Sequence, residues 1–333
     1  MSLALHSLIS GVPASIPSPP VSTFPIFGIT IHYYALCIIA GIIAATLITN
    51  HRLTKRGAEK WVVIDIAIIA VPLAIIGARI FHVLTHFDFY FGPGKNTWNP
   101  FEPGSVWAIW EGGIAIFGAL MAGAVGAWLG CRWTGIRFWT FADALAPGLL
   151  LAQAMGRFGN WFNHELFGLP TDLPWGLEIE STNPAYPVGL PEGTLFHPTF
   201  LYEIIWMLAG VAVLLLIERK TTMQWGRALA FYLVWYGIGR SVFESIRTDP
   251  SLLFFGIRTN VWASFAAIVL GVAIWVVVNR RHTGLLPGPY VPGRAPSDRA
   301  AEVDSRDTYT EDDEPELVTV ASSDDNTETT PRS

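Results

Sequence analysis

Charged side chains are scarce in this chain of 333 residues. Asp, Glu, Lys and Arg make up 14% of it, whereas an average soluble domain has about 25%. Apolar residues make up 51% of the chain and gather in long continuous runs. This composition argues against an ordinary soluble enzyme and favours a lipid environment for most of the chain.

Cysteine is also scarce, with Cys37 and Cys131 the two in the chain. Both lie in or beside apolar runs and far apart in the sequence, so we predict neither a disulfide nor a cysteine nucleophile. Residues 1–20 contain no Lys or Arg, although a secretory signal peptide needs such residues before its apolar core. We therefore expect the N-terminal segment to remain on the protein.

The sequence lacks the common motifs of nucleotide and zinc-protease chemistry, namely the P-loop, GxGxxG and HExxH. His82 and His86 have the spacing of a helical metal pair, but no acidic or cysteine ligand clusters with them. We interpret both as packing residues and predict no metal and no cofactor. The net charge of -6 excludes a broadly basic protein that binds nucleic acid.

The negative charge is concentrated in a C-terminal tail. From residue 293 onward there are twelve acidic residues and four arginines, which leaves 15 acidic and 17 basic residues in the rest of the chain. A segment so rich in Pro, Ser, Thr and acids cannot bury enough apolar surface to fold alone. We predict that residues 283–333 are a disordered, acidic cytoplasmic tail, which either recruits a protein partner or is a tolerated extension.

Seven apolar runs approach the length of about 20 residues that a membrane-spanning helix needs. They are continuous rather than alternating, which favours helices over the strands of a membrane barrel. We therefore predict an all-α polytopic membrane protein with seven transmembrane helices. The predicted spans are residues 33–49, 62–84, 113–129, 141–155, 199–217, 228–243 and 255–278.

Basic residues set the predicted orientation, because short loops rich in Lys and Arg stay in the cytoplasm. Such residues follow the first, third, fifth and seventh runs, whereas residues 159–198 contain none. This pattern puts the N-terminus outside and the C-terminus inside. We expect an extracytoplasmic segment at 1–23 and a membrane domain at 24–282. A small extracytoplasmic head at about 159–197 lies between spans 4 and 5.

Among the charged residues within or beside the apolar runs, we single out four: Arg79, Asp143, Arg157 and Arg240. A charged residue near the middle of a span raises the free energy of membrane insertion by about 2.5–3.5 kcal/mol, so each needs a partner or a function. In one interpretation they form ion pairs for bundle assembly, Arg240 with Glu244, and Arg79 or Arg157 with Asp143 or another acid. In the other, arginines from different spans converge on a phosphate, whose oxygens a planar guanidinium binds in pairs.

The spacing of Arg240, Glu244 and Arg247 puts all three on one helical face. The predicted topology places this face, Arg79 and Arg157 at the depth of the outer leaflet. A phosphate ligand at that depth would be the headgroup of an outer-leaflet phospholipid.

The densest polar and glycine-rich segment, residues 156–168, has the sequence GRFGNWFNHELFG. It resembles the signature of the prolipoprotein diacylglyceryl transferase family, GRxGNxxNxE followed by xxG. The resemblance covers roughly residues 24–281 and implies the family's seven spans. Further matches are Tyr33-Tyr34, GAR at 77–79, WEGG at 110–113, HPTFLYE at 197–203, and YGIGRSVFE at 236–244 running on to Arg247.

The resemblance implies an enzyme of the bacterial cytoplasmic membrane with its active site facing the outer leaflet. The family transfers the diacylglyceryl group of phosphatidylglycerol to the lipobox cysteine of a prolipoprotein, which forms a thioether and releases glycerol phosphate. This is the first step of lipoprotein maturation. The implied partners are therefore phosphatidylglycerol, lipobox peptides and membrane lipids, without nucleic acid.

The resemblance also implies roles for individual residues. Arg157 and Arg240 would clamp the lipid phosphate, and Glu244 would orient Arg240. The other residues that we expect to bind phosphatidylglycerol are Asn160, Glu165, Tyr34 and, more weakly, Arg247.

The base that deprotonates the attacking thiol is less clearly marked. A free thiol has a pKa of about 8.5 and is mostly protonated at neutral pH. Many family members have a histidine at the position equivalent to Phe117, but this chain does not. Either another group replaces it or the base is not strictly required. His197 is a candidate replacement, with packing against Pro198 as its alternative role. Glu165 or the leaving phosphate are the alternatives.

Two other classes of protein also fit intramembrane charges. A transporter or lipid flippase would show paired halves with broken helices, and the sequence shows no such symmetry. A non-catalytic scaffold would explain the acidic tail but not the outward arginines.

Overall fold

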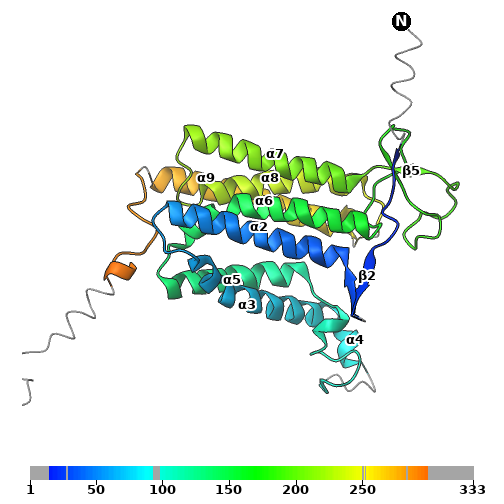
Figure 1. The fold of residues 1–333 in the computed structure, drawn as a ribbon, viewed down its shortest axis with the longest axis horizontal. Helices are drawn as coiled ribbons and strands as arrows, with labels where there is room; N and C mark the ends of the chain where they lie inside the picture. Colours follow the sequence, from blue (N-terminus) through cyan, green and yellow to red (C-terminus); the bar gives the residue numbers. More distant parts are fainter. Residues whose placement is uncertain are drawn as a thin grey trace, which may run out of the picture. The chain divides into compact units, whose positions relative to one another are not determined.

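Seven long helices, of 19 to 25 residues each, dominate the described part of the chain. The computed structural model describes residues 15–27, 29–92, 98–249, 251, 253–282 and 284–298. In Figure 1 these helices lie side by side along one direction. They are α2 (Tyr33–Lys55), α3 (Val62–Thr85), α5 (Ile116–Thr134), α6 (Phe138–Phe162), α7 (Thr199–Lys220), α8 (Arg227–Ile246) and α9 (Thr259–Arg281).

Five of these helices, α2, α3, α5, α7 and α9, are long and apolar enough to cross a membrane. Only 11–33% of their most apolar windows is buried inside the protein. Large apolar side chains such as Ile42, Ile68 and Val269 are instead more than half exposed, at 57%, 60% and 68%. Apolar surface of this extent marks contact with lipid rather than water. The chain is therefore a polytopic membrane protein.

The helices α6 and α8 have the length of a span but fall short of that composition, because they carry polar residues into the bundle. Asp143 and Asn160 on α6 and Glu244 on α8 are all buried. Helix α6 packs against α2, α7 and α8. Two helices below the composition of an ordinary span therefore bring buried polar groups into the bundle.

Helix α6 runs to Phe162, seven residues beyond the predicted end at 155. Arg157 and Asn160 thus belong to the last turns of α6. The sequence had placed them after the end of the span. Aromatic packing supports the extension, since Trp161 stacks on Phe200 and Phe162 stacks on Tyr33. Helix α9 begins at Thr259 rather than 255, because a short hairpin, β6 (Leu253–Phe254) and β7 (Ile257–Arg258), precedes it.

A small sheet follows α6 in the region expected to form a head. Strand β4 (Gly176–Glu178) pairs with β1 (Ser15–Ile16) in parallel and with β5 (Leu195–Phe196) antiparallel. Phe196 of β5 and Phe167 are both buried, with ring centroids 4.7 Å apart. A second hairpin, β2 (Thr23–Ile26) and β3 (Ile29–His32), leads into α2. Figure 1 shows β5, β2 and α4 (Phe87–Phe91) at the same end of the helices, called the head end below.

Small residues let the helices approach closely, as in other membrane bundles. A Cβ atom at Gly118 of α5 would lie 2.2 Å from the carbonyl oxygen of Gly77 on α3. A Cβ atom at Gly148 of α6 would lie 3.0 Å from the Cα of Ala45 on α2. The backbones of α3 and α5, and of α2 and α6, are therefore nearly in contact.

The opposite end of the bundle is held by polar contacts. Asp143 of α6 accepts hydrogen bonds from the backbone N–H groups of Gly226, Ala228 and Leu229, at 2.8, 2.9 and 3.1 Å. A carboxylate at a helix N-terminus satisfies its free N–H groups and complements the helix dipole. Asp143 thus caps α8, and the predicted pairing of Asp143 with Arg79 or Arg157 is wrong.

The segment that follows α9 also packs at this end. The side chain of Arg137 donates to the carbonyl oxygen of Tyr290 at 2.8 Å, and the Tyr290 hydroxyl accepts from the backbone N–H of Glu59 at 2.9 Å. The expected tail starts at 283, whereas this part of it contacts the loops of the bundle. Residues 299–333 of the expected tail and residues 1–14 of the expected N-terminal segment lie outside the described residues.

Candidate active site

Glu203 of α7 links arginines from two other helices. Its Oε2 atom lies 2.6 Å from Nη2 of Arg157 on α6. Its Oε1 atom lies 3.9 Å from Nη1 of Arg240 on α8. The side chain of Glu203 is only 2% exposed, so this contact lies inside the bundle. Arg157 and Arg240 therefore meet at one buried carboxylate.

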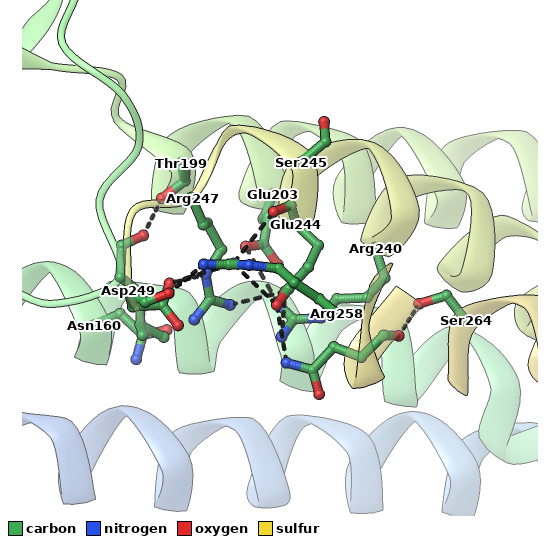
Figure 2. A network of polar contacts seen from close by, with 12 residues as sticks. Asn160, Thr199, Glu203, Arg240, Glu244, Ser245, Arg247, Asp249, Arg258 and Ser264 are labelled. Carbon is green, nitrogen blue, oxygen red and sulfur yellow. Dashed lines mark hydrogen bonds and ion pairs between the residues drawn. The ribbon is translucent and has the colours of Figure 1, made fainter. Parts of the chain in front are cut away.

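A second buried carboxylate, Glu244, lies on the other side of Arg240. Its side chain is 0% exposed, and its Oε2 atom lies 2.9 Å from Nη2 of Arg240 and 3.5 Å from Nη1 of Arg247. Its Oε1 atom contacts Nη1 of Arg258 at 3.2 Å and accepts from Nδ2 of Asn260 at 3.0 Å. Figure 2 shows Glu244 and Glu203 together with the arginines at 240, 247 and 258.

Positive charge exceeds negative charge in this cluster. Arg247 also pairs with Asp249, with Nε to Oδ1 at 2.6 Å. Four arginines, at 157, 240, 247 and 258, thus face three acids, Glu203, Glu244 and Asp249. The Nη1 atoms of Arg240 and Arg247 are buried without a hydrogen bond. These two atoms lie 3.9 and 3.5 Å from carboxylate oxygens of Glu203 and Glu244, and a phosphate oxygen would give each a hydrogen bond.

The glycine-rich signature lies next to this cluster on α6. Arg157 donates from Nη1 to Oδ1 of Asn160 at 3.1 Å. The amides of Asn160 and Asn163 both donate to Oε1 of Glu165, at 2.8 and 3.3 Å. The amides of Asn160 and Asn163 therefore share one acceptor. The structure thus brings Arg157, Asn160 and Glu165 into one hydrogen-bonded chain.

Tyr34 lies against this part of α6. A Cβ atom at Gly159 would come within 2.5 Å of the Tyr34 ring, so only glycine permits the approach. The half-buried side chain of Tyr34 is thereby held beside the signature segment.

His197 has a different setting from the other predicted site residues. It lies between β5 and α7, where its Nδ1 atom is 3.2 Å from the hydroxyl of Tyr202. Its Cβ packs close to Gly168. Among the described contacts, none joins His197 to the arginine cluster.

Arg79 has neither of its two predicted roles. Its guanidinium donates to the backbone carbonyl oxygens of residues 105, 106, 112 and 113, at 2.7–3.1 Å. The ring of Tyr90 lies 5.1 Å from its central carbon. Arg79 therefore holds the loop around η1 (Ile109–Glu111) through backbone groups. It pairs with no acid in these contacts and does not reach the cluster.

Sequence reasoning missed four members of the site. Glu203, Asp249, Arg258 and Asn260 were not predicted as site residues, although the HPTFLYE match contains Glu203. Arg258 was overlooked because it was counted within an apolar run. An arginine near the outer end of that run was the signal that could have found it.

Comparison with known proteins identifies the family. A family model described as prolipoprotein diacylglyceryl transferase matches residues 21–277. This range contains every residue of the arginine cluster. The chain belongs to this family.

Several proteins of the prolipoprotein diacylglyceryl transferase family are similar to the chain over most of its length. The protein named phosphatidylglycerol–prolipoprotein diacylglyceryl transferase from Leifsonia xyli subsp. xyli is 62% identical over 90% of the chain and 91% of the relative. That of Paenarthrobacter aurescens is 46% identical over 80% and 84%. One named transferase 2 from Streptomyces coelicolor is 41% identical over 87% and 90%.

Proposed function

We propose that this membrane protein carries out the transfer that names its family. It moves the diacylglyceryl group of phosphatidylglycerol to the lipobox cysteine of a prolipoprotein. The observation that carries this proposal is the meeting of Arg157 and Arg240 on Glu203, with a buried donor of Arg240 left without a hydrogen bond. Family membership and the similarity to named transferases support it.

The proposal includes seven spans, with the head end and the arginine cluster facing the outer leaflet of the bacterial cytoplasmic membrane. Helices α6 and α8 have 25 and 20 residues, enough to cross a hydrocarbon core of about 30 Å at 1.5 Å per residue. Basic residues support this orientation, because Arg52, Arg219 and Arg280 lie near the helix ends opposite the head.

The chemistry is an attack by a thiolate on the glyceryl carbon that bears the phosphate oxygen. A carbon–sulfur bond forms as the carbon–oxygen bond breaks, and the electron pair leaves with the phosphate. The phosphate group gains one negative charge in this step. Fixed cations beside it stabilise the charge as it develops, which is the role that we assign to Arg157 and Arg240.

Neighbouring residues shape the rest of the site. Glu244 orients Arg240 through their contact at 2.9 Å. Asn160 and Glu165 line the headgroup pocket, Tyr34 contacts the lipid or the incoming thiol, and Arg247 supports Glu244.

The thiol proton has three candidate acceptors. His197 is held by Tyr202, and Glu165 is fixed by two amides. The leaving phosphate is the third. Phe117 packs near Phe81, with ring centroids 6.2 Å apart, and cannot accept a proton.

Transfer from phosphatidylglycerol to a lipobox peptide, measured with the full chain in membranes, tests this function. The wild-type chain should form the thioether, whereas a transporter or a scaffold would not. Arg157→Ala should reduce the rate by about a hundredfold or more, because one oxyanion donor typically contributes that much. The control is Arg281→Gln at the last residue of α9, which should keep its activity. Full activity of Arg157→Ala would refute the phosphate clamp.

A further inference from the structure

Arg258 reaches the cluster from a part of the chain that the family signature does not include. It ends the β6–β7 hairpin and is the residue just before α9. Its Nη1 atom lies 3.2 Å from Oε1 and 3.3 Å from the backbone carbonyl oxygen of Glu244. Its Nη2 atom donates to the carbonyl oxygen of Asp249. One guanidinium thus joins the start of α9 to the end of α8.

Asn260 contacts the same carboxylate oxygen as Arg258. Its Nδ2 atom donates to Oε1 of Glu244 at 3.0 Å. The Oε1 side of Glu244 is therefore occupied from the start of α9, while the Oε2 side faces Arg240 at 2.9 Å. Because the side chain of Glu244 is 0% exposed, its carboxylate has no contact with bulk solvent.

We propose that Arg258, with Asn260, is a positioning residue for the transfer reaction. The pair fixes the carboxylate of Glu244 so that its Oε2 atom orients Arg240 toward the lipid phosphate. This inference rests on the proposed function of Arg240. Arg258 acts through Glu244 and does not itself touch the reacting atoms.

Two physical arguments support this role. A carboxylate held on one oxygen only is free to rotate about its last bond, whereas contacts on both oxygens fix its plane. Partners behind a group that binds the reacting centre typically change activity tenfold to a hundredfold when they are removed, as around metal ligands. Arg258 also supplies the fourth positive charge against the three acids of the cluster.

The test is a double-mutant cycle between Arg258→Gln and Glu244→Gln, assayed as transfer from phosphatidylglycerol to a lipobox peptide by the full chain. Arg258→Gln alone should lower kcat about tenfold. In the Glu244→Gln background the same change should lower kcat less than about twofold, because residues that act through one group are not additive. Arg258→Lys should recover part of the loss, since an ammonium group still donates to Glu244.

The controls separate this role from a general effect on folding. Thermal unfolding, followed by the fluorescence of the 14 tryptophans, gives the stability of each variant. A loss of kcat that is equal in both backgrounds, or full activity of Arg258→Gln, would overturn the inference. Those results leave the proposed function intact as long as the wild type is active and Arg157→Ala is not. An inactive wild type would instead remove the proposed function itself.

Discussion

Glu203 is a buried carboxylate that compensates the charges of two arginines, Arg157 and Arg240. It is 2% exposed and contacts Arg157 at 2.6 Å. Removing one partner of a buried ion pair leaves an uncompensated charge, which typically costs about 3–5 kcal/mol. Arg157 and Arg240 would then repel each other across the position of Glu203. A change at this residue should therefore affect both stability and turnover.

Glu203→Gln should lower the thermal unfolding midpoint and reduce transfer by at least about tenfold. Its matched control is Glu218→Gln, which breaks the ion pair with Arg52 at 2.6 Å far from the cluster. Glu218→Gln should lower the midpoint but keep the turnover of the folded protein. Equal turnover of the two variants would show that Glu203 has no part in the reaction.

The base can be identified from the pH dependence of two variants. A base contributes most where the thiol is protonated, and less as the pH approaches the free thiol value of about 8.5. If His197 is the base, His197→Ala should lose most of its rate in mildly acidic solution and recover with rising pH. An unchanged profile would exclude His197. The same profile for Glu165→Gln would assign the proton to Glu165.

Part of the site was predictable residue by residue. Arg157 and Arg240 stand out because a charge in an apolar run requires an explanation, and Glu244 follows from helical spacing. Glu203 and Arg258 also lie within predicted apolar runs, but their partners in the site are on other helices, which the sequence does not show. Arg79 shows the reverse case, a charge that stands out in the sequence but does not belong to the site. Its partners are backbone carbonyl oxygens, which no residue type reveals.

At the scale of elements, the buried carboxylate of Asp143 explains where α8 begins. Helix α8 has no capping side chain of its own, and Asp143 supplies that group from α6. The sequence showed Asp143 as an anomalous charge but could not show its acceptor role, because its partners are backbone N–H groups. The end of α6 was also predicted too early, because hydropathy falls in the signature at residues 156–168. In the structure the helix continues to Phe162, and its last residues stack on Tyr33 and Phe200.

Asp143→Ala should lower the thermal unfolding midpoint, because it leaves three N–H groups at the start of α8 without an acceptor. Loss of a helix cap typically costs about 0.5–2 kcal/mol, and burial raises that cost. Asp65→Ala on the exposed face of α3 is the control and should change the midpoint little. Equal midpoints for the two variants would contradict the capping role.

At the scale of the whole molecule, the packing of neighbouring helices brings the residues of the candidate site together. Helix α3 packs on α5, α2 on α6, and α8 on α9. The sequence predicted helices and their approximate limits, but these pairings depend on side-chain shape along whole helices. Trp206 and Trp235 illustrate this, because each indole donates to the other's backbone carbonyl oxygen across α7 and α8.

The orientation of the molecule can be tested by cysteine labelling after both native cysteines are replaced by serine. Ser181→Cys in the head and Thr222→Cys at the opposite end introduce thiols at exposed positions. A maleimide that does not cross membranes should label Ser181→Cys in intact cells, and Thr222→Cys only after permeabilisation. The reverse pattern would invert the proposed topology.

The cap at Asp143 has a consequence for how the length of this protein can vary. Helices α6 and α8 are joined at one end by Asp143 and the start of α8, and at the other by Arg157, Glu203 and Arg240. Both intervals measure about 20 Å at 1.5 Å per residue. Inserting one residue into either helix turns everything beyond it by about 100°, so that only one joint can form. We therefore expect changes in chain length in the loops, because the interval between the two joints has to stay the same along both helices.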